Sequence, residues 1–152
     1  MSAAKEKARQ RDQFEHWLFA MDDILEDFIA NFPGDKQSLD YSPESLKVVE
    51  QWLMDSFATI EDAEEEAGKI PLDRAARYIG ETYRRNLGGK WNLHLKNPKY
   101  VHYGIPELID MAHVPVKVCP LFEATTAIDR REGDMMTKDL LYKKEEQQAA
   151  EA

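Results

Sequence analysis

The chain has 152 residues, of which 43% are hydrophobic, and its formal net charge is −9. This length and apolar content exclude a mostly disordered chain, because the area available for burial can offset the entropy of ordering. A single cysteine, a charged N-terminal stretch and the lack of eighteen consecutive apolar residues exclude a disulfide scaffold, a secreted protein and a membrane span, so we expect a cytoplasmic protein.

A long first helix is predicted by apolar residues that recur at three- and four-residue spacing. Four acids, Asp22, Asp23, Glu26 and Asp27, fall mainly on its other face. Pro33-Gly34 ends the helix, because proline removes a backbone donor and glycine permits the turn. The predicted apolar face consists of Phe14, Trp17, Leu18, Met21, Leu25, Phe28, Ile29 and Phe32.

A second helix is predicted to start at Ser42-Pro43-Glu44. Serine caps free amides, proline suits the first helical position, and glutamate favours the positive end of the helix dipole. Further on, residues 61–66 hold five acids, which repel one another and keep the segment exposed to solvent. The predicted core face of the second helix consists of Leu46, Val49, Leu53 and Phe57.

A third helix is predicted to open at Pro71-Leu72-Asp73 and to end at Gly88-Gly89. Gly80 lies inside it, where a glycine costs about 1 kcal/mol relative to alanine. We therefore expect the backbone of a neighbouring element to approach Gly80 closely. The predicted core face consists of Leu72, Ala75, Ala76, Ile79, Tyr83 and Leu87.

A small antiparallel sheet is predicted after these glycines, because the hydrophobic period changes from helical to two over residues 91–95. Asn97-Pro98 turns the chain, and residues 100–103 are predicted to form the opposed strand. Residues 114–118, bounded by prolines, are predicted to form a third strand.

The C-terminal part is predicted to return to helix. Apolar residues within 121–128 predict one helix, and residues 135–142 predict a further short one. Residues 143–152 lack apolar anchors and predict a disordered tail. Together the elements predict a single α+β domain over residues 1–142, in which three main helices pack on a small antiparallel sheet and one or two short C-terminal helices follow.

Candidate catalytic and metal-binding residues are few. Cys119 with His113 resembles a Cys–His pair, but Cys119 lies in an apolar strand, where a free cysteine acts as a small hydrophobic residue. His94 and His102 would face each other across the predicted hairpin and, with His113, form a three-histidine site. No HExxH or paired CxxC motif accompanies them. We therefore expect no catalytic residue, no metal and no cofactor, and we favour a non-enzymatic protein.

Charge is distributed unevenly along the chain. Residues 1–11 carry +3, residues 12–66 carry −14 and residues 67–104 carry +6. The basic segment suggests nucleic-acid binding, but the negative total and the lack of RRM, KH, helix-turn-helix or zinc-finger motifs disfavour it. The acidic and basic segments either attract each other within the fold or face a partner.

Three stretches of the chain resemble small bacterial families of unknown function. They are LDYSPESL at residues 39–46, ARYIGE at residues 76–81 and GGKW at residues 88–91, and the resemblance covers residues 38–130. Some similar small acidic proteins are encoded beside secreted toxins and act as their immunity proteins. The resemblance therefore implies an immunity-type role, and it carries over no catalytic residue.

The leading hypothesis is a protein-binding module, specifically an immunity-type inhibitor of a basic partner such as a toxin domain. The acidic surface of the first two helices would bind this partner and speed the encounter. No membrane partner is expected, and the oligomeric state stays open. The predicted partner-binding residues are Asp22, Asp23, Glu26, Asp27, Asp55, Asp62, Glu64, Glu65 and Glu66.

Two other hypotheses stay open. A small-ligand-binding protein or an enzyme would use a cleft between the third helix and the hairpin at residues 91–103. Its polar residues would be Tyr83, Arg84, His94 and His102. An adaptor or structural subunit would instead associate through an exposed sheet edge.

Overall fold

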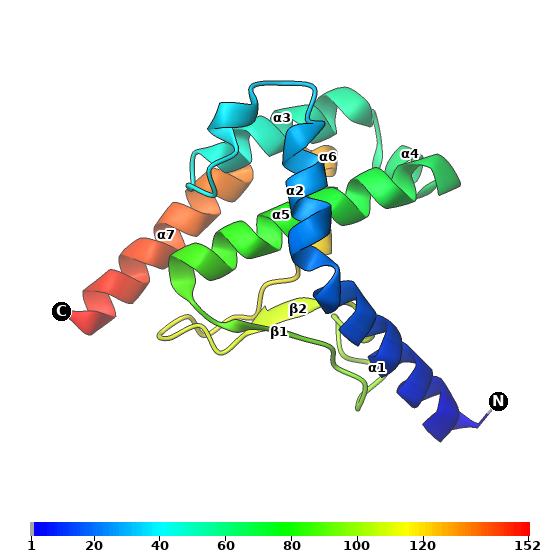
Figure 1. Cartoon of the computed structure of the whole chain (residues 1–152). Coiled ribbons are helices and arrows are strands. Elements are labelled where there is room, and N and C mark those ends of the chain that lie inside the picture. Colours follow the sequence, from blue (N-terminus) through cyan, green and yellow to red (C-terminus); the bar gives the residue numbers. More distant parts are fainter. Residues whose placement is uncertain (1) are drawn as a thin grey trace.

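The structure, a computed structural model, describes residues 2–152 and is mostly helical with one small sheet, broadly an α+β fold (Figure 1). Short 3₁₀ turns lie at Lys36–Ser38 (η1) and Glu66–Gly68 (η2). Within the described residues, the helices and strands are α1 (Ala3–Phe19), α2 (Met21–Ala30), α3 (Ser45–Ser56), α4 (Ile60–Glu64), α5 (Lys69–Leu87), β1 (Lys90–Asn92), β2 (Glu107–Ile109), α6 (Pro120–Arg130) and α7 (Met135–Glu151).

Helix α5 runs through the middle of the molecule (Figure 1). It packs against α2, α3, α4, α6 and α7 and also against β2. Every residue from Ala75 to Tyr83 is buried, and the predicted core face of this helix is confirmed. The expected arrangement of three helices laid on a sheet is not found in that form, because helices surround α5 and the sheet is reduced to a single hairpin.

The predicted long first helix is in fact two helices that meet at Ala20. Arg77 Nη1 on α5 donates to the Trp17 carbonyl at 2.7 Å, an acceptor that a continuous helix would use for the Met21 amide. Helix α2 buries its apolar face, whereas α1 contains no buried residue and leaves Phe19 91% exposed. The predicted apolar face is therefore buried only in the second half of the segment, whereas Phe14, Trp17 and Leu18 of α1 are half-buried.

Helix α3 is close to its prediction. The Ser42 hydroxyl accepts a hydrogen bond from the Ser45 amide at 3.2 Å, so Ser42-Pro43-Glu44 forms a capping turn and the helix itself starts at Ser45. The four predicted core residues of this helix segment are all buried. After α6, Arg131 donates to the carbonyls of Met54 and Phe57 and satisfies the C-terminal end of α3.

The sheet is smaller than predicted. Strand β1 pairs with β2 in antiparallel register, with Trp91 opposite Leu108. The prediction of a strand at residues 100–103 is wrong, because backbone amides in residues 100–105 bond carbonyls three residues earlier and form turns. Residues 114–118 contribute only an isolated bridge from Val118 to Leu108 instead of the predicted third strand.

Gly80 is the point where the hairpin and α6 approach α5 most closely. A Cβ atom at Gly80 would lie 2.1 Å from the Trp91 ring and 2.9 Å from Pro120 Cγ. The predicted close approach is therefore present, but side chains make it and not a neighbouring backbone. The missing side chain lets the Trp91 indole lie directly on the helix.

We expect Gly80→Ala to destabilise the protein by about 1–3 kcal/mol, because the methyl group collides with the Trp91 ring. At an open helical position the same change stabilises by about 1 kcal/mol. Chemical denaturation measures the difference. In a Trp91→Ala background the cost of Gly80→Ala should shrink, and an equal cost in both backgrounds would show that the indole is not the obstacle.

The prediction of a disordered C-terminal tail at residues 143–152 is wrong, because helix α7 extends to Glu151. This helix continues through residues 143–151, which were predicted to be disordered (Figure 1). Gln147 is buried, and its amide nitrogen donates to the carbonyls of Leu87 and Ala112, both at 2.8 Å. One polar side chain thus anchors a stretch that has little apolar surface.

We expect Gln147→Ala to destabilise the protein by about 1–2 kcal/mol, because two carbonyls lose their donor. Gln148→Ala is the matched control, since Gln148 is the same residue type on the exposed face of α7. Thermal and urea unfolding compare the two variants with the parent. Equal stability of both variants would contradict the anchoring role of Gln147.

Candidate functional site

All nine predicted partner-binding acids are exposed on the surface of α2, α3, α4 and η2. Three of them have partners: Asp27 pairs with Arg74 at 2.6 Å, Glu66 pairs with Lys69 at 3.0 Å, and Asp55 accepts from Gln51. Among residues 2–152 the other six carboxylates make no hydrogen bond or ion pair. These six are Asp22, Asp23, Glu26, Asp62, Glu64 and Glu65.

Two adjoining surface grooves, with volumes of about 190 and 650 Å³, are lined by the end of α2 and the turn after it, by α3 and by the start of α5. Both are lined by Phe32, Pro33 and Trp52, so we call them together the Trp52 groove. Ile70, which is 67% exposed, lines one part and Asp55 the other. Trp52 stands at this surface with its ring packed edge-on against Phe28, at a centroid distance of 5.6 Å. The sequence predicted no groove at these residues.

The four residues of the predicted alternative cleft do not form one site. Tyr83 is buried and donates to Asp139 Oδ2 on α7 at 2.7 Å, whereas Arg84 pairs with Glu81 on its own helix. His94 accepts from a backbone amide of its own loop, and His102 contacts Glu107 at 3.0 Å. These contacts point in different directions and leave no common cleft.

Glu107 is the centre of a buried polar cluster that sequence reasoning missed. This fully buried carboxylate accepts from Tyr100 at 2.6 Å and Asn92 at 2.9 Å, and it contacts His102 Nδ1 at 3.0 Å. Burial alone would raise the pKa of Glu107, but these bonds outweigh burial and lower it. Tyr100 lies between the two histidines, which therefore do not face each other as predicted. With its acceptors occupied, the cluster holds the loop between the strands.

Cys119 is a buried thiol. Burial raises its pKa to about 11, so the thiol is protonated at neutral pH and is a poor nucleophile. Its sulfur lies 3.7 Å from the Pro106 carbonyl. His113 is exposed on a loop, and no contact joins it to Cys119 among the described residues.

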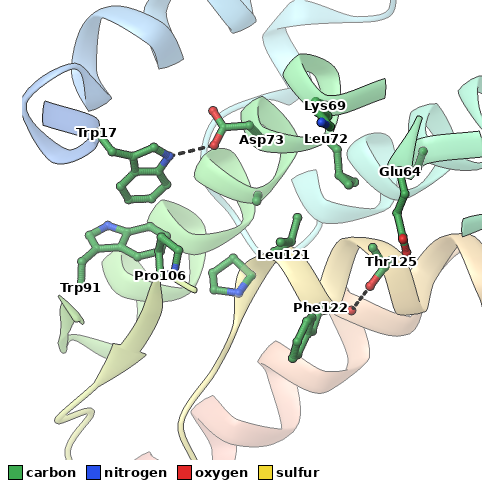
Figure 2. Close-up of a pocket in the computed structure, with 13 residues that line it drawn as sticks. Trp17, Glu64, Lys69, Leu72, Asp73, Trp91, Pro106, Leu121, Phe122 and Thr125 are labelled. Carbon is green, nitrogen blue, oxygen red and sulfur yellow. Dashed lines mark hydrogen bonds between the residues drawn. The ribbon is translucent and has the colours of Figure 1, made fainter. Parts of the chain in front are cut away.

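Two indoles are fixed to α5 by carboxylates of that helix, and Figure 2 shows the first of these contacts, from Trp17 to Asp73. Trp17 Nε1 donates to Asp73 Oδ1, and Trp91 Nε1 donates to Glu81 Oε1, each at 2.8 Å. The two rings meet edge to face at a centroid distance of 4.9 Å. Arg77 lies between the carboxylates along α5, bonds Asp73 and stacks on the Trp17 ring at 4.3 Å. We call this arrangement the indole clamp.

Beside the indole clamp lies a partly open cavity of about 660 Å³, the indole cavity, which is lined by residues of α1, α4, α5 and α6 and by Trp91 and Pro106 (Figure 2). Its lining is mostly apolar, and its polar side chains are few. Of the hairpin segment predicted at residues 91–103, Trp91 alone lines it, and none of the four predicted cleft residues does. The lining consists of Trp17, Ala63, Glu64, Lys69, Leu72, Asp73, Ala76, Trp91, Pro106, Pro120, Leu121, Phe122 and Thr125.

Comparison of the chain with protein-family models, curated proteins and solved structures found no match in any of the three. Over residues 2–152, no helix combines the length and the apolar character that a membrane crossing requires. The same residues hold no group of three or more His, Cys, Asp or Glu side chains arranged to bind a metal ion.

Glu123 on α6 is a half-buried carboxylate beside Tyr83, Asp139 and Lys143. Burial is the main cause that raises its pKa to about 7. The charge of Asp139 adds to this rise, and Lys143 opposes it. Glu50 on α3 also raises the pKa of Glu123. The Glu50 carboxylate accepts hydrogen bonds from the first two backbone amides of α7.

We expect the protein to lose stability as the pH rises from roughly 5 to 8. The unfolded chain releases the Glu123 proton near its ordinary pKa, whereas the folded chain holds it until about pH 7. Glu123→Gln should remove this loss and stabilise the protein at pH 8 by about 1–3 kcal/mol. Urea unfolding at both pH values tests this, with the exposed Glu132→Gln as control. If the free energy of unfolding changed between the two pH values by the same amount in the parent and in Glu123→Gln, the raised pKa of Glu123 would be contradicted.

Proposed function

We propose that this protein is a non-enzymatic binding module for a basic protein, and that its specific role is immunity-type inhibition of a basic toxin domain. The single observation that carries the proposal is the set of six exposed carboxylates on or beside α2 and α4 that make no ion pair within residues 2–152. Neighbouring acids within each of these two segments repel one another, and a cationic partner would relieve that repulsion.

The Trp52 groove supports a protein partner more than a small cation. Protein interfaces combine an apolar centre, in which a few aromatic residues dominate the binding energy, with a polar rim. Phe32, Trp52 and Ile70 supply the apolar lining here. The charged lining residues are Asp55, Lys47 and Arg74, and Arg74 is paired with Asp27. The acids would attract the partner, and the aromatic surface would slow its release.

The candidate catalytic side chains from the sequence lie away from this surface. The histidine, glutamate and cysteine that would serve an enzyme are held in structural contacts elsewhere, with Glu107 bonded on its loop and Cys119 protonated. An inhibitor needs only to cover a basic surface, so charge and shape suffice. The immunity-type role itself rests on this charge pattern and on the resemblance of the three sequence stretches.

We expect neutralisation of four acids to slow association with the partner about tenfold at low salt. The variant carries Asp22→Asn, Asp23→Asn, Glu26→Gln and Asp62→Asn, and its slower association follows from the loss of electrostatic steering. A partner captured from cells of the source on immobilised protein is purified, and stopped-flow kinetics then measure its association at low and high salt. Added salt should slow the parent more than the variant.

The matched control neutralises four exposed acids at the other end of the chain, which gives the same net charge. Its association rate should stay near that of the parent, and circular dichroism checks that both variants fold. If both variants slowed association equally, the rate would depend on net charge alone, and a localised binding surface would be contradicted. The control acids are Glu132, Glu145, Glu146 and Glu151.

A further inference from the structure

We propose that the indole cavity binds a small organic cation, a molecule with an aromatic or branched apolar body and one positively charged head. The indole cavity shares no lining residue with the Trp52 groove, and Glu64 is the one predicted partner-binding acid that lines the cavity. The argument for a ligand uses the shape, rings and charge of the cavity and needs no protein partner. The inference therefore does not rest on the proposed function.

The size and lining of the cavity fit a small organic ligand. Its volume of about 660 Å³ lies within the usual range for such sites. Space is left because small side chains, among them Ala63, Ala76 and Thr125, line the walls. Gly80 lets the Trp91 ring lie where a Cβ atom of α5 would otherwise be. This volume exceeds that of one amino-acid side chain, which favours a free ligand over a side chain of a partner.

The aromatic walls are fixed before any ligand arrives. The indole N–H groups of Trp17 and Trp91 each donate to a carboxylate of α5, and Arg77 stacks on one face of the Trp17 ring. A ligand would therefore meet rigid rings and lose little affinity to the ordering of side chains. Aromatic faces also carry a negative potential that attracts cations.

The charges at the cavity favour a cation. Among residues 2–152 the Glu64 carboxylate makes no hydrogen bond or ion pair, and it lines the cavity. The Asp73 side chain stays 43% exposed although it accepts from Trp17 and Arg77. Lys69, the one basic residue in the lining, is paired with Glu66 and turned largely to solvent. An anionic ligand would meet a carboxylate with no counter-charge left to offset it.

The test compares three probes that share a phenylethyl body and differ in the head: phenethylamine, 2-phenylethanol and 3-phenylpropionate. Each tryptophan gives one indole N–H signal in a proton–nitrogen NMR spectrum, and Trp52→Phe identifies one of the three. We expect phenethylamine to shift the Trp17 and Trp91 signals and to bind at least threefold tighter than the alcohol. The Trp52 signal is the internal control and should stay in place.

Two variants locate the binding. Glu64→Gln, at an exposed position, should weaken phenethylamine several-fold and leave 2-phenylethanol unchanged. Thr125→Phe should fill the cavity and abolish the shifts, whereas Thr126→Phe, one residue along and outside the lining, should keep them. Because Glu64→Gln removes no packing, it keeps the test decisive where Thr125→Phe fails to fold.

Several outcomes would overturn the proposal. They are equal or tighter binding of 3-phenylpropionate, no binding by any probe, shifts confined to Trp52, and unchanged phenethylamine binding in Glu64→Gln or in folded Thr125→Phe. A further titration uses N-acetylarginine amide, whose charged head sits on an aliphatic stem. Tighter binding of that probe than of phenethylamine would assign the cavity to a partner's side chain and overturn the free-ligand assignment.

Discussion

The fold depends on one constraint, the burial of α5 on all sides over its central turns. Such a helix must satisfy charged side chains in its own middle, because an unpaired buried charge is strongly unfavourable. Arg77 and Glu81 meet this demand by bonding elements that are distant in sequence, Trp17 of α1 and Trp91 of β1. Charge satisfaction on α5 thereby fixes both the N-terminal helix and the hairpin.

The ion pairs of α5 also determine which surface charges stay unpaired. Since the basic residues of α5 are engaged with Asp27, Asp73 and Glu81, they do not neutralise most acids of α2 and α4. Those acids stay exposed without an ion pair, as the proposed function requires. The indole clamp holds two rings against α5 and leaves the indole cavity beside them. Both candidate sites thus follow from how one buried helix satisfies its charges.

The sequence predicted well those features that depend on neighbours along the chain. The buried faces of α3 and α5 followed from three- and four-residue spacing, and the ends at Ser42 and Gly88 followed from capping chemistry. The exposure of the acids also followed, because charged side chains seldom lose their solvent. Sequence reasoning failed where a distant group intervened. Arg77 donates to the Trp17 carbonyl where the first helix is interrupted. Tyr100 and His102 contact the buried Glu107, and their segment forms turns instead of a strand.

By itself, then, the sequence determined the helical class, the core faces of the main helices and the acidic surface, because local spacing and solvation govern these. Only the tertiary structure decided the sites. The indole clamp joins Trp17 to Asp73 and Trp91 to Glu81, and the Trp52 groove brings Trp52 beside Ile70. Gln147 turned a predicted tail into an anchored helix through two carbonyls far away in sequence. No periodicity encodes such pairs, since their contacts form only after the helices have packed.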